Sequence, residues 1–199
     1  MRMFTGIALT SVCRAAVAAA VATLRADPAP VSWVAPGNLH VTLKFLGETS
    51  PNRVGAVADA LAGVAANFPP FGLEAEGAGL FPGTRNPRVL WVGLREPLEL
   101  VRELQENMEN ALSGAGFPRE DRPFHPHITV GRARGVLPPA WGDRFLRALS
   151  GRRFGEVPVP KITLYESRLS PGGAVYTVVR DFLLSGGARA WRENKERSP

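Results

Sequence analysis

The chain lacks the features that mark secreted and membrane proteins. Its one cysteine, Cys13, excludes an internal disulfide and is compatible with a reducing cytoplasm, where we expect the protein to act. No stretch approaches the roughly 20 apolar residues of a membrane span. The alanine-rich N-terminus resembles a secretory signal superficially, but Arg14 interrupts it. We interpret it as a strand followed by a helix that Ser11 caps.

Lysine is scarce too, since only three of the 24 basic residues are lysines and the rest are arginines. The formal net charge is +6. Arginine grips phosphate through a planar guanidinium that makes two parallel hydrogen bonds. A basic, arginine-dominated chain therefore suits a polyanionic partner, although arginine content also follows genomic base composition.

Histidine is rare, with three in the chain, yet two of them stand in nearly the same tetrapeptide. His40-Val41-Thr42-Leu43 returns as His127-Ile128-Thr129-Val130, and a turn containing proline precedes each copy. Alternate side chains of a strand share a face, so each copy puts a His and a Thr on one side. Each copy therefore predicts a half-buried strand that presents one imidazole and one hydroxyl.

Paired imidazoles suit acid–base chemistry, because an ordinary histidine pKa of about 6.5 allows opposite protonation states near neutral pH. A threonine hydroxyl beside each could hold an oxyanion. These groups suffice for in-line displacement at a phosphodiester without a metal. One His-x-Thr alone would more often be a surface histidine, and the matched second copy favours the catalytic interpretation.

A metal site is the alternative interpretation of these histidines. His125-Pro126-His127 could supply two zinc ligands, with His40 as a third. No Asp, Glu or Cys stands beside them to complete the shell. We therefore predict no metal and no cofactor, and we interpret His125 as a surface or supporting residue.

The motif repeat belongs to a longer one, because predicted strands and helices recur in the same order at offsets of 86 to 88 residues. We infer an internal duplication with repeat units of about 4–88 and 89–184, followed by a polar tail at 185–199. Within one domain, 1–184, we predict an α+β fold of two pseudo-symmetric lobes, with largely antiparallel sheets around a central cleft and helices outside. His40 and His127 would then face each other across one phosphate.

The residues around the motifs closely resemble the 2H phosphoesterases over 1–184. The likeness is carried by Trp33-Val34, 38–47, Pro87 to Trp91 and Phe124 to Arg132. Within that superfamily the chain is most similar to the RNA 2′,3′-cyclic phosphodiesterases, once described as 2′-5′ RNA ligases. The resemblance implies metal-independent hydrolysis of RNA 2′,3′-cyclic phosphate ends to 2′-phosphates, with reversible 2′-5′ ligation as an accompanying reaction.

The resemblance also implies residue roles. His40 would be the proton donor to the leaving 3′ oxygen, and His127 the proton acceptor that activates water. Thr42 and Thr129 would bind the phosphate. Arg132 is a further phosphate ligand that ideal alternation aims away from the histidine face, so a bulge at Gly131 would have to turn it back.

Aromatic and arginine residues outside the four motif positions are assigned from their side-chain type and their position in the sequence. Phe45, also at an odd offset from its histidine, is expected in the core. Phe124 and Tyr176 are candidates for stacking a terminal base, with Trp33 and Phe81 as weaker ones. Four arginines in loops or at strand starts are expected to form a basic rim for a longer RNA: Arg85, Arg88, Arg119 and Arg122.

Other functions also fit. The chain could be an RNA-end binding module without turnover, although both histidines and both threonines are present. It could instead be a phosphodiesterase acting on a small cyclic nucleotide or on a 2′-5′ oligonucleotide. No membrane and no obligate protein partner are indicated, and we expect a monomer.

Overall fold

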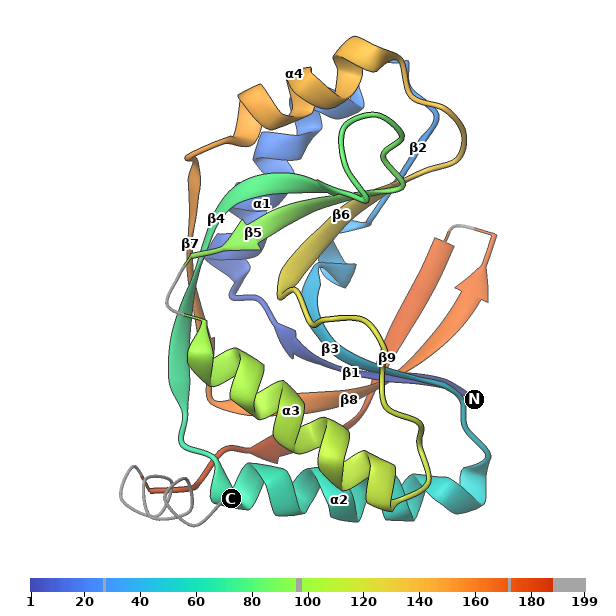
Figure 1. Ribbon diagram of the computed structural model, residues 1–199, viewed down its shortest axis with the longest axis vertical. Coiled ribbons are helices and arrows are strands. Elements are labelled where there is room, and N and C mark those ends of the chain that lie inside the picture. Colours follow the sequence, from blue (N-terminus) through green and yellow to red (C-terminus); the bar gives the residue numbers. More distant parts are fainter. Residues whose placement is uncertain (27, 96–97, 172, 188–199) are drawn as a thin grey trace.

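A nine-stranded sheet with four α-helices forms in the residues that the computed structural model describes, 1–26, 28–95, 98–171 and 173–187 (Figure 1). Every strand pair in these ranges is antiparallel. The elements are β1 (Arg2–Ala8), α1 (Ser11–Arg25), β2 (Val31–Trp33), η1 (Pro36–Asn38), β3 (His40–Glu48), η2 (Pro51–Arg53), α2 (Val54–Asn67), β4 (Phe71–Phe81), β5 (Val89–Leu94), α3 (Glu99–Gly114), β6 (His127–Ala133), α4 (Pro139–Leu149), β7 (Arg153–Val159), β8 (Lys161–Ser170) and β9 (Gly173–Leu183).

The strand order reflects the duplication. The sheet runs β7-β4-β5-β6-β3-β1-β8-β9, with β2 paired to β6 off this path. The motif strands β6 and β3 lie at the middle, flanked by β5 and β1, the matching first strands of the two repeats. The sheet curls, and α2 and α3 pack together on one side while α1 and α4 lie at the other end (Figure 1). The predicted α+β architecture with antiparallel strands and outer helices is confirmed.

The N-terminal segment forms a strand followed by a helix, as predicted from its sequence. The N-cap is Thr10 and not Ser11, because the Thr10 hydroxyl accepts a hydrogen bond from the Cys13 N–H at 3.1 Å. Cys13, Val17 and Val21 then place an apolar stripe at helical spacing against the core. None of the helices in the described part of the chain is long and apolar enough to cross a membrane.

The predicted elements agree with the structure apart from two additional strands and some helix ends. The strands β2 and β7 were not predicted, and the short 3₁₀ turn η2 directly precedes α2. Of the predicted tail, Ser185 and Gly186 donate backbone hydrogen bonds to the carbonyls of Ala65 and Phe68. The remainder of that prediction, 188–199, lies outside the described residues.

Candidate active site

The two motif strands are direct neighbours, and Val41 of β3 pairs with Ile128 of β6. In an antiparallel pair this register sets His40 beside Thr129 and Thr42 beside His127. Val41 and Ile128 are fully buried, whereas the four motif side chains are partly buried on the opposite face. The sheet therefore brings both imidazoles and both hydroxyls to one surface, arranged around a local twofold centre.

Each imidazole is oriented by a backbone carbonyl two residues earlier. His40 Nδ1 lies 2.7 Å from the Asn38 carbonyl oxygen, and His127 Nδ1 lies 2.6 Å from that of His125. A carbonyl oxygen can only accept, so each Nδ1 carries a proton. The Nε2 atoms are therefore the nitrogens that gain or lose protons in any reaction.

Thr42 is the hydrogen-bond partner of the His40 Nε2, with its hydroxyl oxygen at 2.8 Å. The hydroxyl donates to neutral His40, and the direction reverses when His40 is protonated. Among the described residues Thr129 makes no such bond to His127. The two halves of the site therefore differ in how closely the hydroxyl is tied to its imidazole.

A bulge follows the threonine in each motif strand. Along β3, Thr42 pairs with Gly6 but Lys44 with Thr5, so Leu43 is an extra residue. Along β6, Thr129 pairs with Trp91 but Gly131 with Leu90, so Val130 is the extra residue. Val130 stands 87 residues after Leu43, the same offset as the two histidines. Each bulge reverses the alternation of side chains beyond it.

The bulges decide where Phe45 and Arg132 point. The bulge at Val130, one residue before the expected Gly131, returns Arg132 to the histidine face, and its charge acts on both histidines. The expectation that Phe45 is a core residue is wrong, because the bulge at Leu43 leaves it 60% exposed. The Phe45 ring lies 6.2 Å from that of Phe4, which in turn lies 4.8 Å from the His40 imidazole.

The pKa values of both histidines are lowered. Burial is the main cause for each, and the hydrogen bond to a backbone carbonyl opposes it. The charges of His127 and Arg132 lower the pKa of His40 further, and those of Arg132 and His125 act likewise on His127. These effects favour neutral imidazoles, and a bound anion would offset them.

Two matches to one family model identify the family of this chain. The model for the LigT-like phosphoesterases matches residues 7–91 and again 92–176. The chain belongs to the LigT-like phosphoesterase family. It is 32% identical to a Methanothermobacter thermautotrophicus protein named RNA 2′,3′-cyclic phosphodiesterase, over 92% of this chain and 99% of the relative.

Solved LigT-like structures share the fold. The crystal structure of TT0787 from Thermus thermophilus superposes with a TM-score of 0.77 at 30% identity, covering 94% of this chain and 99% of that one. The crystal structure of Escherichia coli LigT complexed with 3′-AMP has a TM-score of 0.75 at 30% identity, covering 92% and 98%.

Aromatic rings surround both histidines of this LigT-like phosphoesterase. Tyr176 meets the His40 ring edge-on at 5.4 Å, and Phe81 meets the His127 ring edge-on at 5.1 Å. Of the four stacking candidates, the structure therefore places Tyr176 and Phe81 against the imidazoles. Phe124 packs against the core, and Trp33 packs 6.0 Å from the Trp141 ring.

A glycine makes room for the His40 ring. A Cβ at Gly6 would lie 3.2 Å from His40 Cδ2 and 2.8 Å from the Val41 carbonyl oxygen. Gly6 pairs with Thr42 across β1 and β3, so it lies directly beside the first motif. No pattern in the sequence indicates this role, because glycine in a strand usually indicates only a bend or a weak point.

The hairpin of β8 and β9 is tied to the first motif through Asn38. The Asn38 side-chain amide donates to the Ala174 carbonyl at 2.6 Å. The backbone carbonyl of Asn38 accepts the hydrogen bond from His40 Nδ1. His125 holds the equivalent place before His127. Its side chain is exposed, with the ring 6.0 Å from that of Phe81, and no group able to hold a metal occurs among the described residues.

The expected basic rim divides into two kinds of arginine. Arg119 donates to Glu106 and Asn110 of α3, and Arg122 donates to Glu120. Arg85 and Arg88 are exposed and form no ion pair within the described part of the chain. The second pair is therefore better suited to bind phosphate.

Proposed function

We propose that this LigT-like phosphoesterase hydrolyses the 2′,3′-cyclic phosphate at an RNA end to a 2′-phosphate, using His40 and His127 without a metal. One observation carries the proposal. Two imidazoles with the same Nδ1–H tautomer stand on adjacent strands of one face, so two Nε2 atoms are available to a single phosphate. The name of the Methanothermobacter relative supports the substrate class.

The proton transfers follow from the tautomers. The Nε2 of neutral His127 takes a proton from water as its oxygen bonds to phosphorus. The bond between phosphorus and O3′ breaks, and the Nε2–H of protonated His40 gives its proton to O3′. Thr42, Thr129 and Arg132 supply donors for the phosphoryl oxygens, whose charge grows in the transition state.

The surroundings of the two histidines support this direction. Both ring oxygens of a 2′,3′-cyclic phosphate belong to the ribose, so the leaving O3′ stays with the nucleoside and water attacks from the opposite side. Rings lie against both histidines, but the exposed Phe45 lies on the His40 side, where a nucleoside can stack, and it contacts the buried Phe4 ring that packs on His40. On the His127 strand, the position equivalent to Phe45 is occupied by the cationic Arg132. His40 is then the acid, and His127 the base.

Other substrates use the same groups. A 5′-hydroxyl in the place of water would yield a 2′-5′ linkage, and cyclic mononucleotides or 2′-5′ oligonucleotides present the same phosphodiester. Rates on a cyclic mononucleotide, an RNA with a cyclic end and a 2′-5′ oligomer would rank them. We expect the cyclic RNA end to be hydrolysed to a 2′-phosphate.

A 3′-phosphate product would contradict the proposed bond cleavage. Tight RNA-end binding without turnover between pH 5 and 8 would favour a binding module instead. That second function has the support of the aromatic and cationic groups alone, whereas the fixed imidazole tautomers are required only by catalysis.

A further inference from the structure

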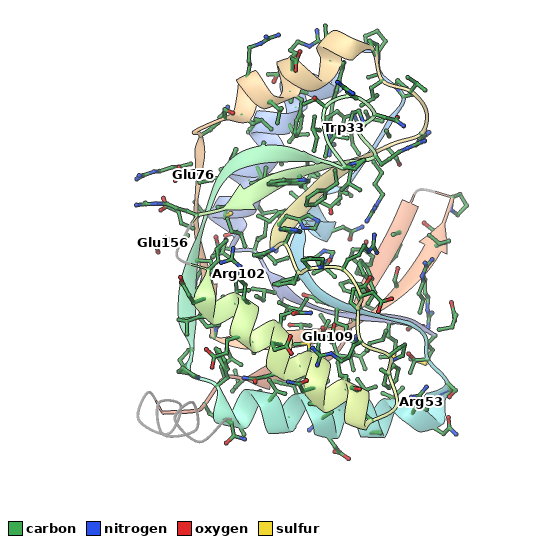
Figure 2. All side chains as sticks on the ribbon, in the orientation of Figure 1. Trp33, Arg53, Glu76, Arg102, Glu109 and Glu156 are labelled. Carbon is green, nitrogen blue, oxygen red and sulfur yellow. The ribbon has the colours of Figure 1, made fainter. Side chains whose placement is uncertain are left out.

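A buried ion pair joins the first motif strand to the segment ahead of the second motif. Lys44 follows the bulge in β3 and is 5% exposed, and Glu109 of α3 is 3% exposed. The Lys44 Nζ donates to Glu109 Oε2 at 2.7 Å and to the Pro118 carbonyl at 2.8 Å. Glu109 lies between α3 and the sheet (Figure 2).

Two further donors complete the network around Glu109. Gln105 Nε2 donates to its Oε1 at 3.1 Å, and the Glu120 backbone N–H donates to its Oε2 at 3.3 Å. The carboxylate therefore joins three segments, which are β3, α3 and the loop that contains Pro118 and Glu120. A buried polar network whose members are all satisfied specifies one arrangement of the segments that it joins.

Stability is a weak reason for this pair. Transfer of two charges into a protein interior has a desolvation cost that their attraction often fails to exceed, and apolar replacements of similar volume are often neutral or stabilising. The pair is also confined to one repeat, since Gly131 holds the position equivalent to Lys44. What is special about this repeat is that its strand lies against the loop leading to His127.

We infer that Lys44 and Glu109 are positioning residues that hold the loop before the second motif and thereby set the ring of His127. That loop supplies the His125 carbonyl, which accepts the His127 Nδ1 proton at 2.6 Å. Without the pair, the loop gains freedom and the His127 ring becomes less buried and less fixed. The catalytic part of the inference rests on the proposed function.

The variants separate positioning from folding. Lys44→Met and Glu109→Leu each leave one buried charge unpaired and should lower the Tm. The double variant Lys44→Met/Glu109→Leu removes both charges and should recover part of the lost Tm, while the Gln105 amide, the Glu120 N–H and the Pro118 carbonyl lose a partner. Lys161→Met is the matched control, because Lys161 also pairs with a carboxylate, Asp181, but these side chains are 39% and 38% exposed.

Two measurements are made on each variant. One is kcat and KM on a cyclic mononucleotide. The other is an NMR titration of the three histidines without substrate, assigned with His→Gln variants, which reports on His127 whether or not the enzyme turns over. His40, His125 and Arg132, whose charges also act on the site, are unchanged in the Lys44, Glu109 and Lys161 variants that are compared.

The double variant should have a higher Tm than either single variant, yet its His127 pKa should rise and its kcat should fall about tenfold with little change in KM. Lys161→Met should alter neither the His127 pKa nor kcat. An unchanged His127 titration in the double variant would overturn the inference, and so would a shifted titration with wild-type kcat. If the wild type shows no turnover, the proposed function fails, while the titration still decides whether the pair positions His127.

Discussion

Phe45 and Arg132 occupy equivalent places in the two repeats, each five residues after a motif histidine, and equivalent bulges bring both side chains to the histidine face. The duplicated scaffold thus presents an aromatic ring on one side and a guanidinium on the other. A nucleoside phosphate offers an aromatic base to the ring and an anionic phosphate to the guanidinium. Substitutions of Phe45 and Arg132 should therefore weaken binding of different parts of the substrate.

Phe45→Ala should weaken the grip on the base. Stacking of a base on an aromatic ring contributes about 1–3 kcal/mol, so kcat/KM on nucleoside 2′,3′-cyclic phosphates should fall roughly 5- to 150-fold. A base-free ribose cyclic phosphate should be hydrolysed as before. Equal losses on both substrates would show that Phe45 acts on the phosphate or the fold, and Val12→Ala, in another exposed apolar residue, controls for surface effects.

Arg132→Gln should reduce kcat/KM on both of those substrates, because the lost hydrogen bond is to the phosphate. A charge-assisted hydrogen bond contributes about 1.5–3 kcal/mol, which corresponds to roughly 10- to 150-fold. Lysine at this position keeps the charge but not the two-donor geometry, so Arg132→Lys should recover part of the loss. A wild-type rate in Arg132→Gln would remove this residue from the site.

Stability should depend on pH through the two histidines. Because their pKa values in the folded protein are lower than the ordinary value of about 6.5, the unfolded chain binds more protons as pH falls through that region. The free energy of unfolding should be greatest above pH 6.5 and should decrease as the pH falls through the lowered pKa values. Chemical denaturation at several pH values measures this. A His40→Gln/His127→Gln variant should show a shallower decrease, and the same slope as in the wild type would contradict the assignment.

Gly6→Ala should disturb the site directly. The added Cβ would lie 2.8 Å from the Val41 carbonyl oxygen, a backbone atom that cannot turn aside. We expect a lower Tm and a lower kcat, measured by thermal unfolding and steady-state kinetics. Gly63→Ala in α2, where nothing lies within 4 Å of the new Cβ, should instead stabilise the protein by about 0.5–1 kcal/mol.

Metal chelation should leave the reaction unchanged. The proposed proton transfers use only imidazole, hydroxyl and guanidinium groups of the chain. Activity measured after dialysis against EDTA should match that of untreated enzyme. A loss that added zinc or magnesium restores would show that the mechanism needs a metal.

The fold and the histidine pair could be predicted because a period-2 pattern and a repeated motif are visible in sequence. Phe45 was misplaced because a one-residue bulge reverses alternation without leaving a mark in composition, and the equivalent bulge in β6 returns Arg132 to the histidine face. The strand β2 has only three residues, and β7 contains Gly155 and Pro158, so neither gives a strand pattern. The contact of Tyr176 with His40 depends on how the sheet curls, which no local pattern encodes.

The central claim is that His40 and His127 transfer protons at one phosphate in opposite directions. The most direct test is the pH dependence of single-turnover hydrolysis for the wild type, His40→Ala and His127→Ala. The wild type should give a bell-shaped profile, and each variant should be slower by roughly 10²- to 10⁴-fold. His127→Ala should lose the acidic limb and His40→Ala the alkaline limb. A folded variant of either histidine that keeps the wild-type rate and both limbs would contradict the mechanism.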